Sequence, residues 1–155
     1  MQIRWIALLC VALPLLAVAG EKAPRVFLTV HVEMVANDSD KFARPVELLH
    51  AKRSTFISTG PDLSDRDVLD VIPFDAKDGT KGAYLRLSPG GRIRLEAVSQ
   101  SYRGRALVVF IQARQIVDLH IDRRIEDGIL PVPSGLTDAD VAELKHRAEL
   151  NRKRE

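Results

Sequence analysis

Cysteine is almost absent from this chain, whose only thiol is Cys10. A single cysteine forms no intramolecular disulfide, so the fold has to be stabilised by packing. Cys10 also lies within the first 19 residues, where Arg4 is the only charged residue. A nucleophilic cysteine in the remainder of the chain is therefore excluded.

The usual short motifs of catalysis and cofactor binding are absent as well. The sequence contains no G-x-S-x-G, no G-x-x-x-x-G-K-[ST], no G-x-G-x-x-G and no H-E-x-x-H. These patterns mark nucleophilic serines, phosphate-binding loops, dinucleotide sites and zinc sites. Their absence favours a protein that is not an enzyme, and we predict no catalytic residue and no cofactor.

Positive and negative residues are nearly balanced in number. The chain has 23 Lys and Arg against 21 Asp and Glu. This balance gives no overall electrostatic signature for nucleic acid, so we expect no nucleic-acid partner. Basic residues concentrate only in Lys145-His146-Arg147 and Arg152-Lys153-Arg154. A solvated helix end explains them, and peripheral contact with an anionic membrane is the alternative.

The longest apolar run lies at the N-terminus and is short for a membrane span. From Trp5 to Gly20 there are only 16 residues, interrupted by Pro14, whereas a spanning helix needs about 20. Small residues at Ala17 and Ala19 suit a cleavage site. We therefore predict a signal peptide at residues 1–19 and a single extracytoplasmic domain at 20–155, periplasmic or secreted. An uncleaved anchor is the alternative.

Alternation of apolar and polar residues predicts strands in the first half. A period-2 pattern covers 25–36, and a second strand is expected at 42–49, where Pro45 favours a sheet edge. A short strand is expected near 55–57. The S-x-x-D sequence at Ser64 precedes an apolar run to Ile72 and predicts a short helix that ends at Pro73.

The second half predicts the order β-α-β-β-β-α. Its strands are expected at 82–87, 105–113, 115–121 and 129–132, the middle two forming a hairpin connected at Ala113 and Arg114. The first helix carries Ile93, Val98 and Tyr102, with Leu95 off the best apolar stripe. After a turn at 133–136, a capping box at Thr137 begins a C-terminal helix with Val141, Leu144 and Ala148 on one face.

These elements predict the α+β class. We expect a mainly antiparallel sheet with the two helices of the second half packed on one face, together with N-terminal strands and one short helix.

One set of residues could form a metal site. On a strand, Asp118, His120 and Asp122 point to the same face, and their oxygen and nitrogen atoms suit a cation. A solvent-exposed face of an antiparallel strand explains the same pattern. His31 and Glu33 repeat it on the first strand, where a solvent face is again the simpler interpretation.

Several segments resemble the periplasmic head subdomain of SecD, the protein-export subunit of the SecDF membrane complex. They are Ala83–Leu87 with Pro89-Gly90-Gly91, Ser99–Leu107, Gln112–Val117, Asp127–Val132 and Leu136-Thr137 with Val141–Leu144, within about residues 82–149. The resemblance implies an extracytoplasmic setting and a protein or peptide partner in the cell envelope. It implies an exported, non-enzymatic binding or scaffolding module. The alternative is a metal-binding protein or metal-dependent hydrolase that uses Asp118, His120 and Asp122.

Overall fold

The computed structural model describes residues 26–35 and 43–155. The predicted signal peptide at 1–19, with Cys10, lies outside the described residues. The elements of the described chain are β1 (Leu28–Met34), β2 (Ala43–Glu47), β3 (Ser54–Ser58), β4 (Leu63–Ser64), the 3-10 turn η1 (Asp65–Asp67), β5 (Val68–Asp75), β6 (Lys81–Leu87), α1 (Pro89–Ser101), β7 (Ala106–Ile111), β8 (Arg114–His120), β9 (Ile129–Leu136) and α2 (Asp138–Arg152). No helix in these ranges is both long and apolar enough to cross a bilayer.

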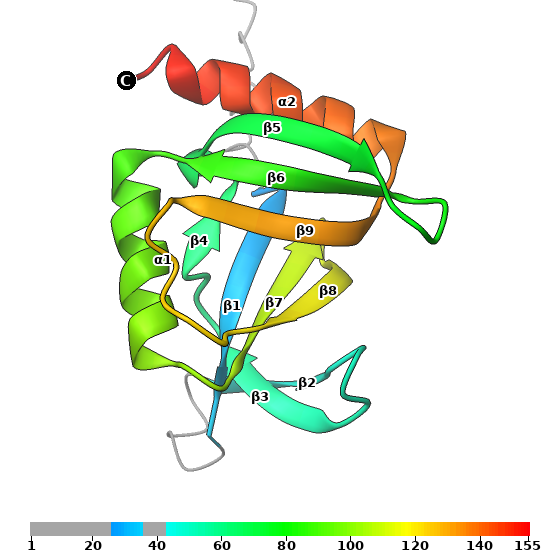
Figure 1. Cartoon of the computed structure of the whole chain (residues 1–155), viewed down its shortest axis with the longest axis vertical. Coiled ribbons are helices and arrows are strands. Elements are labelled where there is room, and N and C mark those ends of the chain that lie inside the picture. Colours follow the sequence, from blue (N-terminus) through cyan, green and yellow to red (C-terminus); the bar gives the residue numbers. More distant parts are fainter. Residues whose placement is uncertain (1–25, 36–42) are drawn as a thin grey trace, which may run out of the picture.

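The strands are divided between two antiparallel sheets, shown in Figure 1. The larger sheet has the order β2-β3-β1-β7-β8, with β4 paired to β1, and the smaller has the order β5-β6-β9. The predicted α+β class is confirmed, although the strands form two sheets where we expected one. The chain changes sheets at η1, which directs β5 away from β1 and toward β6.

The main core lies between the two sheets. Alternate residues of β6 and β9, among them Leu85, Leu130 and Val132, are fully buried against apolar residues of β1 and β7. Period-2 alternation places these side chains on one face of the smaller sheet and leaves Tyr84 and Pro131 on the other. The smaller sheet therefore has one buried face and one exposed face.

Strand β7 is buried on both faces, since all six of its residues are buried. Leu107, Val109 and Ile111 belong to the main core. Ala106, Val108 and Phe110 face a second, smaller core that also contains Leu48 and Ile57 from the β2–β3 hairpin. This double burial explains why the sequence of β7 is an uninterrupted apolar run rather than an alternating one.

The two helices close different sides of the main core (Figure 1). Helix α2 packs on β5 and η1, whereas α1 contacts β4 and β6. As predicted, Val141, Leu144 and Ala148 are buried on α2, and the Thr137 side chain accepts a hydrogen bond from the Asp140 amide. On α1 the expected stripe is wrong, because Leu95 is fully buried and Ile93 is 66% exposed.

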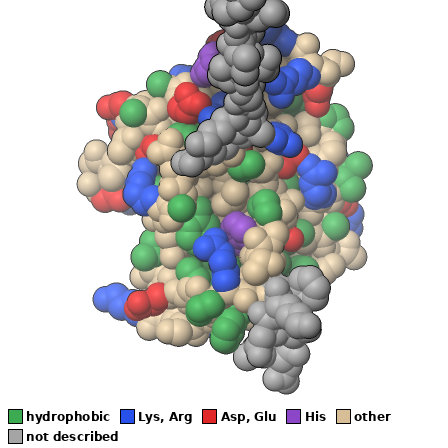
Figure 2. Space-filling model, turned by 180° about the vertical axis from the view of Figure 1, so that it is seen from behind, with side chains coloured by type: hydrophobic (Ala, Val, Ile, Leu, Met, Phe, Trp, Pro, Cys, Tyr) green, Lys and Arg blue, Asp and Glu red, His purple; other side chains and the backbone are tan. Residues whose placement is uncertain are grey.

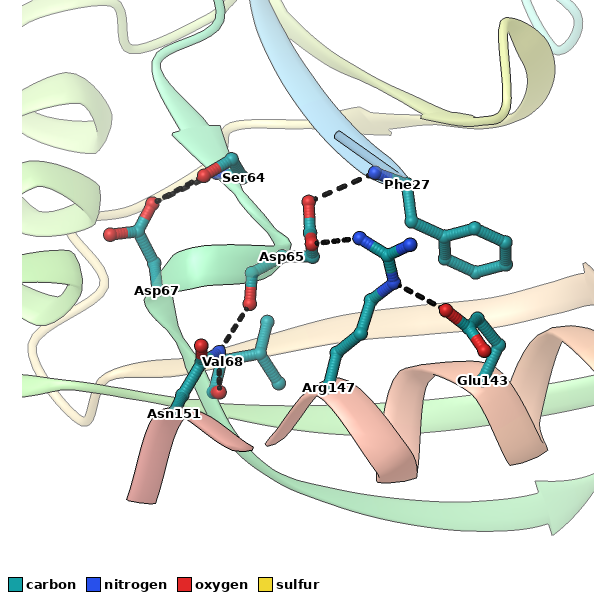
Figure 3. Close-up of polar contacts among 8 residues, drawn as sticks. All are labelled: Phe27, Ser64, Asp65, Asp67, Val68, Glu143, Arg147 and Asn151. Atoms are coloured by element: carbon teal, nitrogen blue, oxygen red, sulfur yellow. Dashed lines mark hydrogen bonds and ion pairs between the residues drawn. The ribbon is translucent and has the colours of Figure 1, made fainter. Parts of the chain in front are cut away.

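Side chains of α2 bind the segment around η1, Arg147 through the Asp65 side chain and Asn151 through the backbone, as Figure 3 shows. The buried Asp65 carboxylate accepts one hydrogen bond from the Phe27 amide at 3.0 Å and another from the Arg147 guanidinium at 2.8 Å. The Asn151 side-chain amide donates to the carbonyl oxygens of Asp65 and Val68. These contacts fix α2 against the start of β1 and of β5.

The short helix predicted from Ser64 to Ile72 is wrong. Its first turn does form, and the Asp67 carboxylate accepts a hydrogen bond from the Ser64 amide at 2.9 Å. The following apolar residues instead extend as β5 and pair with β6, a conformation that β-branched Val68, Val71 and Ile72 favour. Pro73 is tolerated within β5 because β5 is an edge strand.

Two predicted connections also differ from the structure. The turn expected at 133–136 belongs to β9, whose register with β6 shifts between Lys81 and Ala83. The β7–β8 hairpin turns at Gln112 and Ala113, one residue earlier than expected, and both have positive φ. Left-handed conformation at both central residues suits the twist of a two-residue hairpin.

Candidate binding groove

A groove of about 890 Å³ opens where the free edges of the two sheets meet. Strand β8 is the last strand of the larger sheet and β9 the last strand of the smaller one. The groove is lined by β8, by the outer face of β6 and β9, by the β2–β3 turn and by the β8–β9 loop. We call it the β8–β9 groove.

Its apolar lining comes from both sheets. Tyr84 and Ile129, which are 47% and 36% exposed, lie on the outer face of the smaller sheet together with Pro131. Leu119 of β8 and Ile125 of the β8–β9 loop are partly buried against the main core and also line the groove. A concave surface with mainly apolar walls and a few polar groups is typical of a binding site.

Asp118, His120 and Asp122 all line this groove, but Asp118 has a structural contact. Its side chain is only 5% exposed. One carboxylate oxygen accepts hydrogen bonds from the Leu49 and His50 amides at 2.8 and 3.1 Å, and His50 Nδ1 lies 3.3 Å from the same oxygen. Asp118 thereby holds the β2–β3 turn against β8.

His120 ends β8, Asp122 lies just beyond it, and both are exposed. The backbone carbonyl of Asp122 accepts a hydrogen bond from Arg103 Nε at 2.8 Å. Within residues 26–35 and 43–155 no three His, Cys, Asp or Glu side chains are placed to hold a metal ion together. The metal hypothesis stays a prediction that metal analysis of the protein can test.

His31 and Glu33, expected on a solvent face, are buried at 4% and 6% exposure. The reason is the β2–β3 hairpin, which pairs with the end of β1 and covers the face that these residues share. His31 Nδ1 donates a hydrogen bond to the Ser58 carbonyl at 2.8 Å, and its ring packs edge-on against Phe110. Burial lowers the pKa of His31 below its ordinary value.

The Glu33 carboxylate connects β1, β3 and β7. It accepts hydrogen bonds from the Thr55 hydroxyl at 2.8 Å and the Ala106 amide at 3.0 Å, and Arg53 lies 2.6 Å away. Burial raises the pKa of Glu33, but these three donors outweigh it, and the pKa falls below its ordinary value. Glu33 is therefore a buried anion with both carboxylate oxygens engaged, and it forms one polar end of the groove.

The β8–β9 loop is held in place by its own hydrogen bonds. The Ile125 amide donates to Ser99 Oγ of α1 at 2.9 Å, Arg124 forms an ion pair with Glu96, and the Ile129 amide donates to Asp127. Gly128 adopts φ +70°, which a residue with a side chain rarely does. This wall of the groove is therefore preformed.

Sequence reasoning missed the apolar half of the groove. Its residues come from two strands, β6 and β9, whose pairing is not visible in the sequence. In the structure Tyr84 pairs with Pro131, and Arg86 pairs with Ile129. The signal that could have indicated it is Pro131-Val132-Pro133, since two prolines in a strand indicate an edge.

Comparison with solved structures identifies a shared fold. A structure of SecDF, described as a membrane component that enhances protein export, superposes with a TM-score of 0.56 at 14% identity, covering 81% of this chain and 62% of that chain. A structure of SecDF in a super-membrane-facing form gives a TM-score of 0.56 at 15% identity, covering 81% of this chain and 19% of that chain.

No protein-family model matches the sequence, and the curated proteins give no match. The resemblance to SecD predicted for residues 82–149 is thus confirmed as a likeness of fold, and it extends over more of the chain than we expected. The chain spans less than two thirds of either SecDF chain. The protein accordingly has a SecD-like fold of the α+β class.

Proposed function

We propose that this protein is an exported, non-enzymatic binding module that holds an extended segment of another polypeptide in the β8–β9 groove. The observation that carries the proposal is the position of the groove at the free edges of both sheets. An edge strand presents unpaired backbone N–H and C=O groups, which an added strand can pair with. The module would act in the periplasm or at the cell surface.

Strand β8 is the better of the two edges for pairing. Proline lacks the N–H group that a ladder needs, and Pro131 and Pro133 reduce the donors that β9 offers. Strand β8 contains no proline, and among the described residues it pairs only with β7. The part that lines the groove is Val117 to His120, because Gly135 of β9 lies against the Ile116 backbone. An incoming segment would therefore extend the larger sheet.

The groove walls favour a segment with alternating character. Successive side chains of a strand point to opposite faces. On one face of an added strand they would meet Leu119, Ile125 and Ile129, and on the other they would meet His50 and His120. The preferred partner is thus an extended peptide with an apolar residue at every second position.

The SecD-like fold supports a role in protein export. The SecDF structures belong to a membrane component that enhances protein export. A module that transiently pairs with an unfolded exported chain would fit that setting, and main-chain pairing tolerates many sequences. A protein of the cell envelope with a free extended segment is the alternative source of the peptide.

Binding of N-methylated peptides tests the proposal. The probe is a fluorescein-labelled peptide about as long as the 7-residue β8, with valine and threonine alternating and lysines at its ends. Only alternate N–H groups of an added strand face β8. Methylation of one set of alternate amides is expected to abolish binding measured by fluorescence anisotropy, while methylation of the other set preserves it.

A pair of variants locates the binding site. Tyr84→Ser with Ile129→Ser is expected to weaken binding at least tenfold, because central apolar contacts each contribute about 1 kcal/mol or more. Ile93→Ser on α1, which removes another exposed apolar side chain, is the control. Equal affinity for both methylated peptides, or equal loss in both variants, would contradict pairing at this groove.

A further inference from the structure

A second surface lies where the C-terminal half of α2 meets η1, and it shares no residue with the β8–β9 groove. It is a hollow of about 200 Å³ whose lining includes Val26, Arg66, His146, Leu150 and Arg154. We call it the α2–η1 surface. In Figure 2, Lys and Arg side chains lie in the upper part of the molecule together with Asp and Glu side chains, at the end where α2 lies in Figure 1.

One cation binds both acidic groups that line this surface. Asp65 and Glu143 both bind the Arg147 guanidinium, at 2.8 and 2.6 Å (Figure 3). Arg66 and Arg154 make no ion pair with any residue in the described part of the chain. The lining thus has three Arg against two carboxylates, and residues 145–155 add Lys145, Arg152 and Lys153 against Glu149 and Glu155. The surface therefore carries a net positive charge.

Two apolar side chains are exposed in the same hollow. Val26 is 40% exposed and Leu150 is 39% exposed, although both are large aliphatic residues. Cationic side chains beside exposed aliphatic ones are typical of segments that lie in the headgroup region of a membrane. The cations bind lipid phosphates, and the aliphatic groups contact the upper acyl chains.

The chain outside the described domain joins it at this surface. Val26 begins the described residues, and the segment before it contains the uncharged stretch from Trp5 to Gly20. Where this stretch is retained as an uncleaved anchor, the alternative to a cleaved signal peptide, the membrane that holds it is close to Val26, Arg66 and Arg154. Because Asp65, Arg147 and Asn151 hold α2 on η1, the cations and the aliphatic groups are preorganised on one side of the domain.

From the charge and from the point where the chain enters, we propose that the α2–η1 surface binds the anionic phospholipid surface of a membrane. Such binding would orient the domain with α2 toward the bilayer. The β8–β9 groove, which has a separate lining, would stay accessible to a partner.

Vesicle binding of the full chain tests this proposal. The probes are vesicles of phosphatidylcholine alone and vesicles with about 30% phosphatidylglycerol, and binding is measured by co-sedimentation. The N-terminal apolar stretch contributes to both, so the ratio of the two partition coefficients isolates the electrostatic part. Arg66→Gln with Arg154→Gln is expected to lower that ratio about 25-fold, since each basic residue contributes about fivefold.

The matched control removes the same charge elsewhere. Lys77→Gln with Arg92→Gln changes two exposed cations on the β5–β6 loop and on α1, and is expected to leave the ratio within about twofold. Leu150→Gln is expected to weaken binding to anionic vesicles severalfold with all cations retained. A ratio near one for the unmodified chain, or an equal decrease in both double variants, would overturn the proposal.

Discussion

Buried charge is the most consequential feature at the scale of single residues. Glu33 lies at 6% exposure between β1, β3 and β7, where Thr55, Arg53 and the Ala106 amide supply its hydrogen bonds. A buried carboxylate is costly unless such donors surround it. Its neighbour His31 lacks comparable compensation, and burial therefore favours the neutral form of its ring.

His31 predicts a loss of stability on mild acidification. Burial lowers its pKa in the folded state below the ordinary 6.5, so the unfolded chain takes up a proton first as pH falls. The free energy of unfolding should therefore decrease as pH falls below about 6.5, and level off below the folded pKa. Urea unfolding at pH 7.5 and 5.5 measures this decrease.

The corresponding variants separate His31 from other groups. His31→Gln should show a smaller decrease between the two pH values, whereas His120→Gln, which changes an exposed histidine, should behave as the unmodified chain. Identical decreases in all three proteins would assign the effect to other residues.

Asp118 predicts a structural effect on the β2–β3 turn. Asp118→Ala leaves the Leu49 and His50 amides without their acceptor and should lower the free energy of unfolding by about 0.5 to 1.5 kcal/mol. Asp122→Ala, at an exposed position, should change it by less than about 0.5 kcal/mol. Equal effects in urea unfolding would contradict the contact.

The same variants decide the metal hypothesis. If Asp118, His120 and Asp122 hold a cation, the purified protein should contain it in stoichiometric amount by elemental analysis, and Ala at any of the three should remove it. Protein that contains no metal after incubation with zinc and desalting would reject the hypothesis. A loss confined to Asp118→Ala would point to misfolding of the turn.

At the scale of secondary-structure elements, close approach of β5, β6 and β9 depends on Gly82. A Cβ atom there would lie 2.4 Å from the Phe74 ring and 2.6 Å from the Pro133 carbonyl oxygen. The ring could shift, but the backbone oxygen of a paired strand could not. The register shift of β9 opposite Lys81 and Ala83 brings that oxygen close.

Gly82→Ala is therefore expected to destabilise the protein by about 1 to 3 kcal/mol, as overpacking does. Gly60→Ala is the control, since no atom lies within 4 Å of its added Cβ and its φ is not positive. That control should be neutral or stabilise slightly. Thermal unfolding followed by circular dichroism compares the two, and equal melting temperatures would contradict the expected clash.

The sequence predicts an element best where its apolar pattern and the signals at its ends indicate the same secondary structure. The cap at Thr137 and the apolar face of α2 both indicate a helix, and α2 forms as expected. Ser64 also gives a helix start, but the residues after it are β-branched, and pairing with β6 decides in favour of a strand. Local capping therefore fixes a single turn, while long-range pairing determines the conformation of the next residues.

The groove illustrates the same limit at the level of a site. Asp118 and His120 lie on β8, Asp122 comes just after it, and all three line the groove. Two other features depend on contacts between distant segments. The β2–β3 hairpin covers His31 and Glu33, and β8 lies beside β9. Periodicity within one strand carries no information about them.

At the scale of the whole molecule, the two cores share β7 and should unfold together. Leu107 and Val109 belong to one core, and Val108 and Phe110 to the other. The full chain is expected to give one calorimetric transition with equal calorimetric and van't Hoff enthalpies. Two transitions, with the β2–β3 hairpin melting first, would contradict a single domain over 20–155.

The pairing of β1 with β7 has a consequence for the order of assembly. Val30 pairs with Leu63 of β4 on one edge of β1 and with Val109 of β7 on the other, so the β7 edge of this strand meets its partner only after most of the chain has emerged. Until then that edge stays unpaired, and premature association with other unfinished chains competes with correct folding. A helper protein that shields this edge during biogenesis would raise the yield of correctly folded molecules.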